Sequence, residues 1–442
     1  MTPARQLCNI PASGAWVVPP KRCCASISRR SAIRSAAGAT IAEGTLNVNK
    51  KLLGLAVAAS VLGLAAPALA ADVKLGILGD LTGPIESLAP PIVAGAQLAF
   101  DHVNAQGGIL DGKIVSVTGD SACDPSVAGP AADKLVNTDQ VTAIVGAFCT
   151  GATIGAATTA GIPGGVVMIS PSASAPAVTT VADNDLVFRT TPSDAFQGVK
   201  LADLLFGKDV KDVALTYVNN DYGKGLADVF AARFAELGGT VSANLAHEDG
   251  KADYRAELGQ LAGTGSANLV VLGYISGSGL TILQQANESG NFTSYFGGDG
   301  MIGDAISGAN VPNFTATRAG AYAGESANVF TKLATDGGLD PAATYAPQAY
   351  DAAFLLALAV QKNGTADRAG LAAALRDVAS APGEKILPGE WTKAKELIAA
   401  GTDIDYEGAG GPLDFDAAGD VDGIIVEVIW ENGAFVEKGP VK

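Results

Sequence analysis

Residues 141–150 read VTAIVGAFCT, and residues 151–160 continue as GATIGAATTA. The first five residues are mostly apolar or β-branched, which predicts a short buried strand over 141–145. A helix-like pattern then begins at Thr150 and extends to about residue 160. The succession recurs at residues 166–176, VVMISPSASAP, where a second apolar run leads into small and hydroxyl-bearing residues. Strands that alternate with helices predict βαβ units around a mostly parallel sheet.

The same alternation extends on both sides of this stretch. Further strands are expected at residues 73–78, 114–117, 213–217, 240–245, 269–272 and 424–430. Asn432-Gly433 follows the last of these strands and predicts a two-residue hairpin turn. Because no low-complexity linker separates the two halves, we expect two α/β lobes facing one cleft. Ligands of open parallel sheets bind at the carboxyl ends of the strands.

The first 70 residues indicate export. Lys50-Lys51 precede an apolar run over 52–64, and Ala68-Leu69-Ala70 offers small residues at the cleavage positions. These are the three parts of a secretory signal, and the run is short for a transmembrane helix. We therefore expect a signal peptide at residues 46–70, cleavage near Ala70 and a periplasmic location. Residues 1–45 are interpreted as an over-extended N-terminus, with a long targeting peptide as the alternative.

Composition excludes several classes of function. The chain has 442 residues, 48% of them hydrophobic, which is enough for two domains. Residues 1–70 carry eight basic residues and one acidic residue; subtracting their +7 from the total of −16 leaves −23 for the rest. Such a charge argues against nucleic acid as a partner. With only His102 and His247, and no nucleotide-binding, nucleophile-elbow or metal motif, we expect neither enzyme activity nor a cofactor or metal.

The cysteines predict one disulfide. Cys8, Cys23 and Cys24 precede the expected cleavage site, so that Cys123 and Cys149 remain in the exported chain. An even pair in an oxidising compartment predicts a bond between them. Two free buried thiols are the alternative interpretation.

Hydroxyl groups gather where two neighbouring strands end. Thr150 follows the strand at 141–145, while Ser172 and Ser174 follow the strand at 166–169. The N–H groups at a helix start favour an anion, and such hydroxyls can donate to a carboxylate. The alternative is that Thr150 only caps its own helix.

Several motifs occur together in one order. They are C-D-P at 123–125, F-C-T-G at 148–151, S-P-S-A-S-A-P at 170–176, F-R-T at 188–190, D-Y-G-K-G at 221–225 and G-P-L-D-F-D at 411–416. This order resembles the periplasmic leucine/isoleucine/valine-binding proteins of ABC importers, over essentially all of residues 72–440. The resemblance implies two Rossmann-like lobes with parallel-sheet cores joined by a three-segment hinge, the type I periplasmic binding protein fold. Lobe 1 would comprise residues 72–193 and 326–425, and lobe 2 residues 194–325 and 426–442.

The resemblance also implies a set of ligand-binding residues. They are Leu88, Phe148, Thr150, Ser172, Ala173, Ser174, Tyr222, Tyr274, Asp299 and Tyr345. Thr150 and Ser174 would hold a substrate carboxylate, and the Ser172 carbonyl would accept from the ammonium group. Asp299, in the turn Gly298-Asp299-Gly300, would complete the ammonium site where the branched-chain binders have Glu. The three tyrosines and the phenylalanine would surround the side chain, with Leu88 in the place of a covering aromatic residue.

The resemblance implies the substrate-binding subunit of an ABC importer. We expect a monomer that captures a branched-chain or related aliphatic amino acid by lobe closure and delivers it to a membrane permease. Two alternatives stay open: a carboxylate or amide ligand without an ammonium group, and a sensor that reports to a separate signalling receptor. Residues 385–411 are a further departure from the family, interpreted as a surface excursion.

Overall fold

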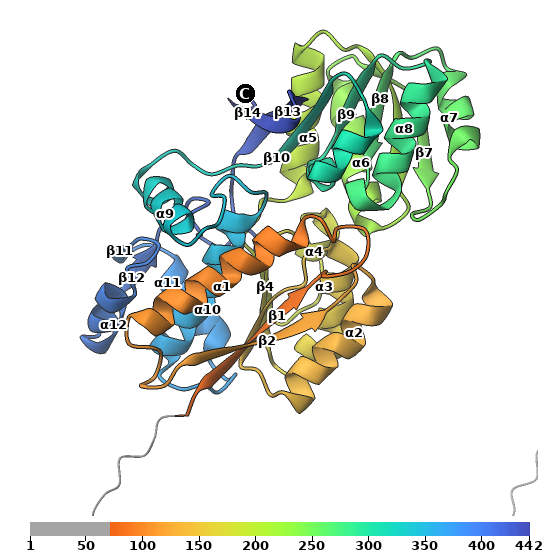
Figure 1. The fold of residues 1–442 in the computed structure, drawn as a ribbon. Helices are drawn as coiled ribbons and strands as arrows, with labels where there is room; N and C mark the ends of the chain where they lie inside the picture. The colour runs from red at the N-terminus through yellow and green to blue at the C-terminus, as the bar shows by residue number, and fades with distance from the viewer. Residues whose placement is uncertain (1–70) are drawn as a thin grey trace, which may run out of the picture. The chain divides into compact units, whose positions relative to one another are not determined.

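The computed structural model describes residues 71–442. The expected signal peptide at 46–70, the segment 1–45, and Cys8, Cys23 and Cys24 lie outside the described residues. Strands and helices alternate around two separate large sheets (Figure 1). Within residues 71–442, no helix combines the length and the apolar character that crossing a membrane requires.

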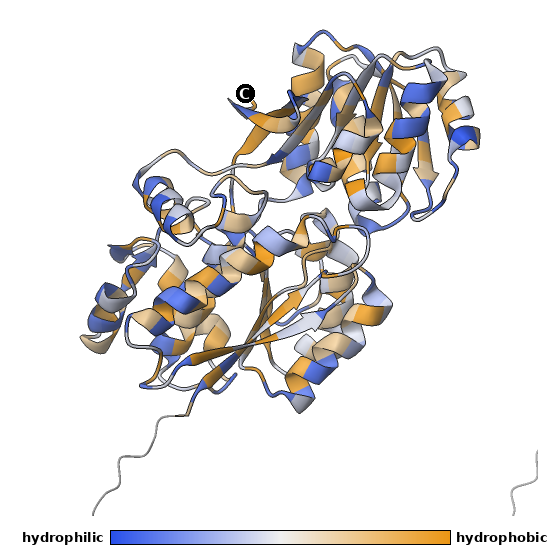
Figure 2. Ribbon diagram, viewed as in Figure 1, coloured by the Kyte–Doolittle hydropathy of each residue, from blue (hydrophilic) through white to orange (hydrophobic). Residues whose placement is uncertain are grey.

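The first lobe is built on a five-stranded sheet in the order β2-β1-β3-β4-β5, with every neighbouring pair parallel. Its strands are β1 (Val73–Gly79), β2 (Ile114–Asp120), β3 (Ala143–Gly146), β4 (Val167–Ser170) and β5 (Val187–Arg189). Helices α1 (Ala89–Ala105) and α10 (Ala346–Asn363) lie side by side on one face, and α2 (Pro125–Asp133) and α3 (Thr150–Ala156) cover the other (Figure 1). All residues of β3 and β4 are buried, as expected for parallel strands covered on both faces. Apolar residues run along β1 and β4 accordingly (Figure 2).

The second lobe is built on a seven-stranded sheet in the order β14-β13-β10-β9-β8-β6-β7. Its strands are β6 (Asp212–Val218), β7 (Thr240–His247), β8 (Asn268–Leu272), β9 (Ser294–Gly297), β10 (Phe314–Ala319), β13 (Ile425–Glu431) and β14 (Ala434–Pro440). β6 to β10 pair in parallel, and β13 and β14 add two antiparallel strands. Its helices are α5 (Asp194–Gly207), α6 (Asp221–Glu236), α7 (Arg255–Ala262) and α8 (Leu280–Ser289). The proposed lobe boundaries after residues 193, 325 and 425 stay predictions.

The hairpin between β13 and β14 forms at the expected turn. Asn432 and Gly433 have φ values of 54° and 83°, the left-handed backbone that a two-residue hairpin turn requires. Glycine adopts this conformation without a Cβ penalty, and asparagine tolerates it better than most residues. The sequence prediction of this hairpin is confirmed.

The segment 385–411 is not a surface excursion. Its Trp391 is fully buried, packs edge-on against Phe354 of α10, and donates from Nε1 to the Gly108 carbonyl at 2.9 Å. Asp351 of α10 accepts from the Tyr406 hydroxyl and from two backbone N–H groups of residues 409 and 410. An indole and a carboxylate therefore attach the segment to the core. The other α-helices and β-strands of residues 71–442 are α4 (Pro176–Thr179), α9 (Glu325–Asp336), α11 (Leu371–Ala379), β11 (Glu384–Ile386), α12 (Trp391–Ala399) and β12 (Ile404–Tyr406).

The two large sheets share one topology. The order β2-β1-β3-β4-β5 in the first is repeated as β7-β6-β8-β9-β10 in the second. In both, the strand order reverses beside the first strand, between β1 and β3 and between β6 and β8. Open parallel sheets bind ligands outside the carboxyl ends of the strands at this reversal. The topology thus singles out the loops that follow β1, β3, β6 and β8.

Candidate functional site

A narrow cavity lies at these loops and contains about 340 Å³ of space not occupied by protein atoms. Residues that follow β1, β3 and β4 of the first lobe line it together with residues that follow β6, β8 and β9 of the second. The lining residues are Ile85, Leu88, Ile92, Phe148, Cys149, Thr150, Ser172, Tyr222, Tyr274, Asp299, Gly300 and Tyr345. The site is therefore built from both lobes.

Asp299 is the most extensively hydrogen-bonded group in this cavity. Its side chain is only 4% exposed. Oδ1 accepts from Gln197 Nε2 at 2.7 Å and from the Tyr222 hydroxyl at 2.9 Å. Oδ2 accepts from the Tyr345 hydroxyl. Within residues 71–442, no lysine, arginine or histidine forms an ion pair with this carboxylate.

Close packing requires a glycine at position 300, beside Asp299. A Cβ atom at Gly300 would stand 2.5 Å from the Gly273 carbonyl oxygen and 3.0 Å from the Tyr222 hydroxyl oxygen. At Gly298 it would meet a methyl group of Leu226 at 2.8 Å, the end of a flexible side chain. The backbone contact at Gly300 is therefore what lets the turn place the carboxylate against the tyrosine.

Three tyrosines surround the carboxylate. Tyr222 and Tyr274 stack with their ring centroids 5.1 Å apart, and the Tyr222 hydroxyl also accepts from the Gly300 N–H. Tyr345 reaches Asp299 from a left-handed backbone conformation, φ 65°, at the start of α10. Burial, followed by the charge of Asp299, raises the pKa of Tyr222 and of Tyr345 well above the ordinary value. Both hydroxyls consequently stay protonated and act as neutral donors.

The turn at residues 170–176 forms the polar wall of the first lobe. Ser172 lines the cavity, and its hydroxyl donates to the Phe148 carbonyl at 2.9 Å. Ala173 and Ser174 are fully buried behind it. Thr150 does not cap its helix as the alternative interpretation held: Cys149 occupies the N-cap position, and Thr150 Oγ1 instead accepts from the Ala175 N–H at 3.4 Å. The threonine hydroxyl therefore faces this turn rather than its own helix.

Arg189 stabilises this turn through hydrogen bonds to its backbone carbonyl groups. Its side chain is completely buried, and Nη1 donates to the carbonyls of Ala173, Ser174 and Ala175 at 2.8–3.4 Å. Nη2 forms an ion pair with Asp420 at 2.6 Å. One guanidinium therefore fixes three consecutive carbonyls of the wall. If Arg189 were removed, these three buried carbonyl groups would lose their charged hydrogen-bond donor.

The disulfide and Asp80 join the same two loops. Cys123 and Cys149 are bonded, as predicted, with their Cα atoms 5.3 Å apart. The Asp80 carboxylate, at the end of β1, accepts from Ser121 Oγ and from the backbone N–H groups of Cys123, Phe148 and Cys149. Burial raises the pKa of Asp80 to about 7, although the backbone donors oppose the shift. Covalent and polar links thus hold the loop that carries Phe148 and Thr150.

Replacing both Cys123 and Cys149 by serine is expected to reduce the free energy of unfolding by about 3 kcal/mol. The bond closes a loop between residues 26 apart, and a loop of this length restricts the unfolded chain by about that amount. Urea unfolding of the double variant beside the wild type measures the difference. A change below about 0.5 kcal/mol would contradict this account, in which the bond stabilises the protein by restricting the unfolded chain.

The opposite wall is apolar. Ile85, Leu88 and Ile92 come from the loop and first turns around the start of α1, and Phe148 comes from the loop after β3. The four side chains are 1–7% exposed. Leu88 lies at the N-cap position of α1, with two prolines following within the first turn. The cavity therefore has one polar end at Asp299 and the hydroxyls, and one aliphatic wall.

The structure brings eight of the ten sequence-predicted residues into the cavity lining and leaves Ala173 and Ser174 behind it. Their roles toward a ligand stay predictions. Sequence reasoning missed Ile85 and Ile92, and it missed Gln197, which donates to Asp299. The sequence did contain a signal for Gln197: it is a polar residue four positions before Leu201, on the same buried face of helix α5.

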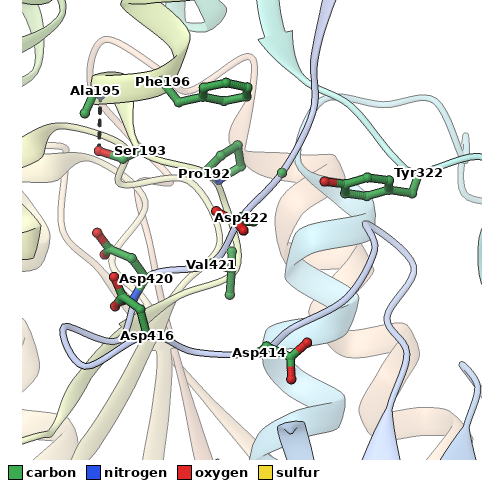
Figure 3. A pocket seen from close by; sticks show the side chains of 11 residues that line it. Pro192, Ser193, Ala195, Phe196, Tyr322, Asp414, Asp416, Asp420, Val421 and Asp422 are labelled. Carbon is green, nitrogen blue, oxygen red and sulfur yellow. Dashed lines mark hydrogen bonds between the residues drawn. The ribbon is translucent and has the colours of Figure 1, made fainter. Parts of the chain in front are cut away.

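A larger open groove, with about 1080 Å³ of space not occupied by protein atoms, lies where the chain passes between the lobes (Figure 3). Its rim carries Asp414, Asp416, Asp420 and Asp422, with Phe196 and Tyr322 beyond them (Figure 3). Asp416 Oδ1 accepts from two backbone N–H groups of its own loop, and Asp420 pairs with Arg189. Asp416 therefore holds the backbone of its own loop, and Asp420 holds the side chains of Arg189 and Thr179.

Comparisons with known proteins agree with this architecture. A family model described as periplasmic binding protein matches residues 72–396. The leucine-, isoleucine-, valine-, threonine- and alanine-binding protein of Pseudomonas aeruginosa is 31% identical over 344 residues, covering 76% of this chain and 89% of the relative. The chemotactic signal transduction system substrate-binding protein BasB of Halobacterium salinarum is 29% identical, over 82% of this chain and 88% of BasB.

A solved structure of a similar protein has the same fold. LivJ of Streptococcus pneumoniae, a branched-chain amino acid transporter substrate binding protein in complex with isoleucine, superposes with a TM-score of 0.69. Its sequence identity is 25%, over 83% of this chain and all of LivJ. The fold is thus that of the type I periplasmic binding proteins, which are solute-binding proteins rather than enzymes and act outside the cytoplasm. With the family match spanning most of its length, the chain belongs to the periplasmic binding protein family.

Proposed function

We propose that this protein is the substrate-binding subunit of an ABC importer, and that it captures a branched-chain or related aliphatic α-amino acid. One observation carries the ligand class. Asp299 is a buried carboxylate that faces a cavity, is held by three neutral donors and has no cationic partner within residues 71–442. A buried charge is costly unless a partner of opposite sign accompanies it. A ligand ammonium group is such a partner.

The number of acceptor positions supports one ammonium contact. An ionised carboxylate offers about four lone-pair positions. Gln197 and Tyr222 use two positions on Oδ1, and Tyr345 uses one on Oδ2. One position on Oδ2 is left for a ligand N–H. Hydrogen bonds between ionised groups are the strong ones, so this position selects a cationic donor.

The hydroxyl-bearing wall suits the carboxylate of the same ligand. The Thr150 hydroxyl accepts one long contact from Ala175 N and donates to no other group of the described chain. Its hydrogen is therefore available to a ligand oxygen. Ser174 and the backbone of the turn at 172–174 lie beside it, and Arg189 keeps that turn in place. An α-amino acid can place its two charged groups between this wall and Asp299.

The remaining surface favours an aliphatic side chain. Ile85, Leu88, Ile92 and Phe148 present carbon to the cavity. A branched alkyl group buried there gains about 25 cal/mol per Å² of apolar surface removed from water. A charged side chain would lose its hydration without gaining a partner. This is the physical reason for an aliphatic amino acid over an acidic or basic one.

Cavity-lining residues from both lobes support capture by lobe closure. Thr150 and Ser172 belong to the first lobe, while Tyr222, Tyr274 and Asp299 belong to the second. A ligand that touches both sets of groups stabilises the arrangement in which they are close. Delivery to a membrane permease is part of the proposal, supported by the transporter role stated for LivJ.

Thermal unfolding with separate ligand panels tests the proposal. A ligand at about 100 times its dissociation constant should stabilise the folded protein by about 2.7 kcal/mol. We expect an increase in Tm with leucine, isoleucine, valine or a related aliphatic amino acid, and none with the matching carboxylates or amides that lack the amino group. A shift with the carboxylates or amides alone would overturn the ligand class and favour the alternative without an ammonium group.

A sensor role is the second candidate, favoured by the similarity to BasB, a chemotactic substrate-binding protein. The two roles share the binding step and differ in the partner of the bound form. Uptake of a labelled ligand by cells that lack the gene separates them. Lost uptake supports the importer subunit, whereas normal uptake with a lost attractant response supports the sensor.

A further inference from the structure

A groove lies beside the cavity, and Leu88 stands between the two spaces. The groove contains about 1000 Å³ of space not occupied by protein atoms. It lies between the first turn of α1 in the first lobe and residues 302–304 and 433–437 of the second. Within residues 71–442, Leu88 is the one residue that lines both the cavity and this groove. With only 7% of its surface exposed, Leu88 forms part of the wall between them.

The start of α1 does not require a polar residue at position 88. Leu88 occupies the N-cap position, where a hydroxyl or carboxylate side chain usually accepts from the N–H group of the second or third helical residue. In α1 these two residues are Pro90 and Pro91, and proline has no backbone N–H. A polar side chain at position 88 would find no such donor. The position is therefore available to an apolar side chain that closes the wall.

Contacts between the lobes hold this wall in place. Ser87, the neighbour of Leu88, is hydrogen-bonded through Oγ to Oγ of Ser276 in the second lobe, at 2.6 Å. A Cβ atom at Gly303 of the second lobe would stand 3.3 Å from Ser87 Oγ and 4.0 Å from Leu88 Cδ2. The backbone of the second lobe consequently lies against both residues of the first.

Two residues of the apolar wall differ in what lies behind them. Ile92, four residues after Leu88, is 1% exposed and lines the cavity but not the groove. Removing its side chain would enlarge a closed space. Removing the Leu88 side chain would instead join the cavity to the groove, where Pro91, Ile302 and Phe435 offer apolar surface.

We propose that Leu88 is a specificity-determining residue that sets the greatest side-chain length of the bound amino acid. This inference rests on the proposed function. The side chain of the ligand lies along Ile85, Ile92 and Phe148 and ends against Leu88. Each further methylene group adds buried apolar surface until the wall is reached, and the next one must displace packed atoms. The limit should therefore lie at the length of the proposed ligands, of which leucine and isoleucine are the largest.

Isothermal titration calorimetry with straight-chain α-amino acids tests this, from norvaline through norleucine and 2-aminoheptanoate to 2-aminodecanoate. In the wild type, affinity should rise about fourfold for each methylene group up to norleucine. It should then fall by about fivefold or more at 2-aminoheptanoate, which overpacks the wall. A wild type whose affinity still rises at 2-aminoheptanoate overturns the proposal.

Leu88→Ala and Ile92→Ala form the matched pair, since both remove the same number of carbon atoms from the apolar wall. Leu88→Ala should bind 2-aminodecanoate at least as tightly as norleucine, because the end of the long side chain lies in the groove. Ile92→Ala should bind 2-aminodecanoate at least about tenfold more weakly than Leu88→Ala, because its enlarged cavity is still closed. Equal affinities of the two variants for 2-aminodecanoate contradict the proposal.

Leu88→Met and Ile92→Met replace the alanine variants if either of those does not fold. Methionine conserves the volume of the residue it replaces, a change that packed sites tolerate well, and its unbranched side chain is flexible. At position 88 it can move into the groove, so affinity for 2-aminoheptanoate should increase by about threefold or more. At position 92 it has no such space, and affinity should not increase. An increase in both variants, or in neither, contradicts the proposal.

Binding by the wild type separates a failure of this proposal from a failure of the proposed function. A wild type that binds neither leucine nor any amino acid of the series contradicts the proposed function. A wild type that binds norvaline and norleucine, with a length limit that substitutions at position 88 do not move, leaves the proposed function intact. That result contradicts only the role of Leu88.

Discussion

Asp299→Ala is expected to weaken amino-acid binding by about 30-fold to several thousand-fold. Removing one partner of a buried charge pair costs about 2–5 kcal/mol, much of it because the other charge is left buried and unpaired. At 1.4 kcal/mol for each factor of ten, this corresponds to a loss between about 30-fold and several thousand-fold. The variant also leaves Tyr222, Tyr345 and Gln197 without their common acceptor. Isothermal titration calorimetry at neutral pH measures the loss.

Asp351→Asn provides the matched control. Asp351 is also a fully buried aspartate with three donors, but it does not line the cavity and anchors the segment around residues 406–410. This variant should change stability and leave affinity unchanged. If Asp299→Ala retains affinity within about threefold of the wild type, the ammonium site is not at Asp299. That outcome would favour the alternative ligand class, a carboxylate or amide whose binding needs no amino group.

Strand prediction succeeded where an apolar run coincided with a buried parallel strand. Residues 141–145 and 166–169 were predicted as strands, and the structure has β3 at Ala143–Gly146 and β4 at Val167–Ser170. The strand ends differ by one or two residues because they depend on hydrogen bonds to neighbouring strands, and a local sequence pattern does not specify these bonds. β10 was not predicted: the alternation in its sequence FTATRA is typical of a half-buried strand and gives no sign that all six residues are buried. Its Arg318 is satisfied by carbonyl oxygens and by Glu437, 119 residues away.

In the site, too, residues that belong to a local motif were predicted, whereas contacts between residues far apart in the sequence were missed. Motifs that follow strand ends located Phe148, Thr150, Ser172 and Asp299, since the carboxyl ends of parallel strands meet at one edge. Gln197 was missed because its partner Asp299 lies 102 residues further along the chain. Trp391 was taken for surface for a similar reason, as its partner carbonyl is 283 residues away. Composition and spacing cannot identify a polar contact across such separations.

Arg189→Met is expected to destabilise the protein by about 3–5 kcal/mol and to weaken ligand binding as well. Breaking a buried ion pair by removing one partner has this cost, since the remaining charge, here Asp420, loses its compensation. The carbonyls of residues 173–175 also lose the one charged donor that they have within residues 71–442, so that the turn that holds the serines is no longer fixed. Urea unfolding measures the first effect, and calorimetric titration of the folded variant measures the second.

Arg368→Met is the control that separates the two effects of Arg189→Met. Arg368 also binds backbone carbonyls of the first lobe, those of Val136, Val141 and Gly164, and none of them belongs to the cavity wall. Its loss should cost stability, about 1–3 kcal/mol, while affinity stays unchanged. A difference in affinity between the two variants would show that Arg189 acts on the ligand through the turn it supports. Equal affinity, with both variants folded, would mean that hydrogen bonds to Ser170 and the flanking prolines hold the turn without the guanidinium.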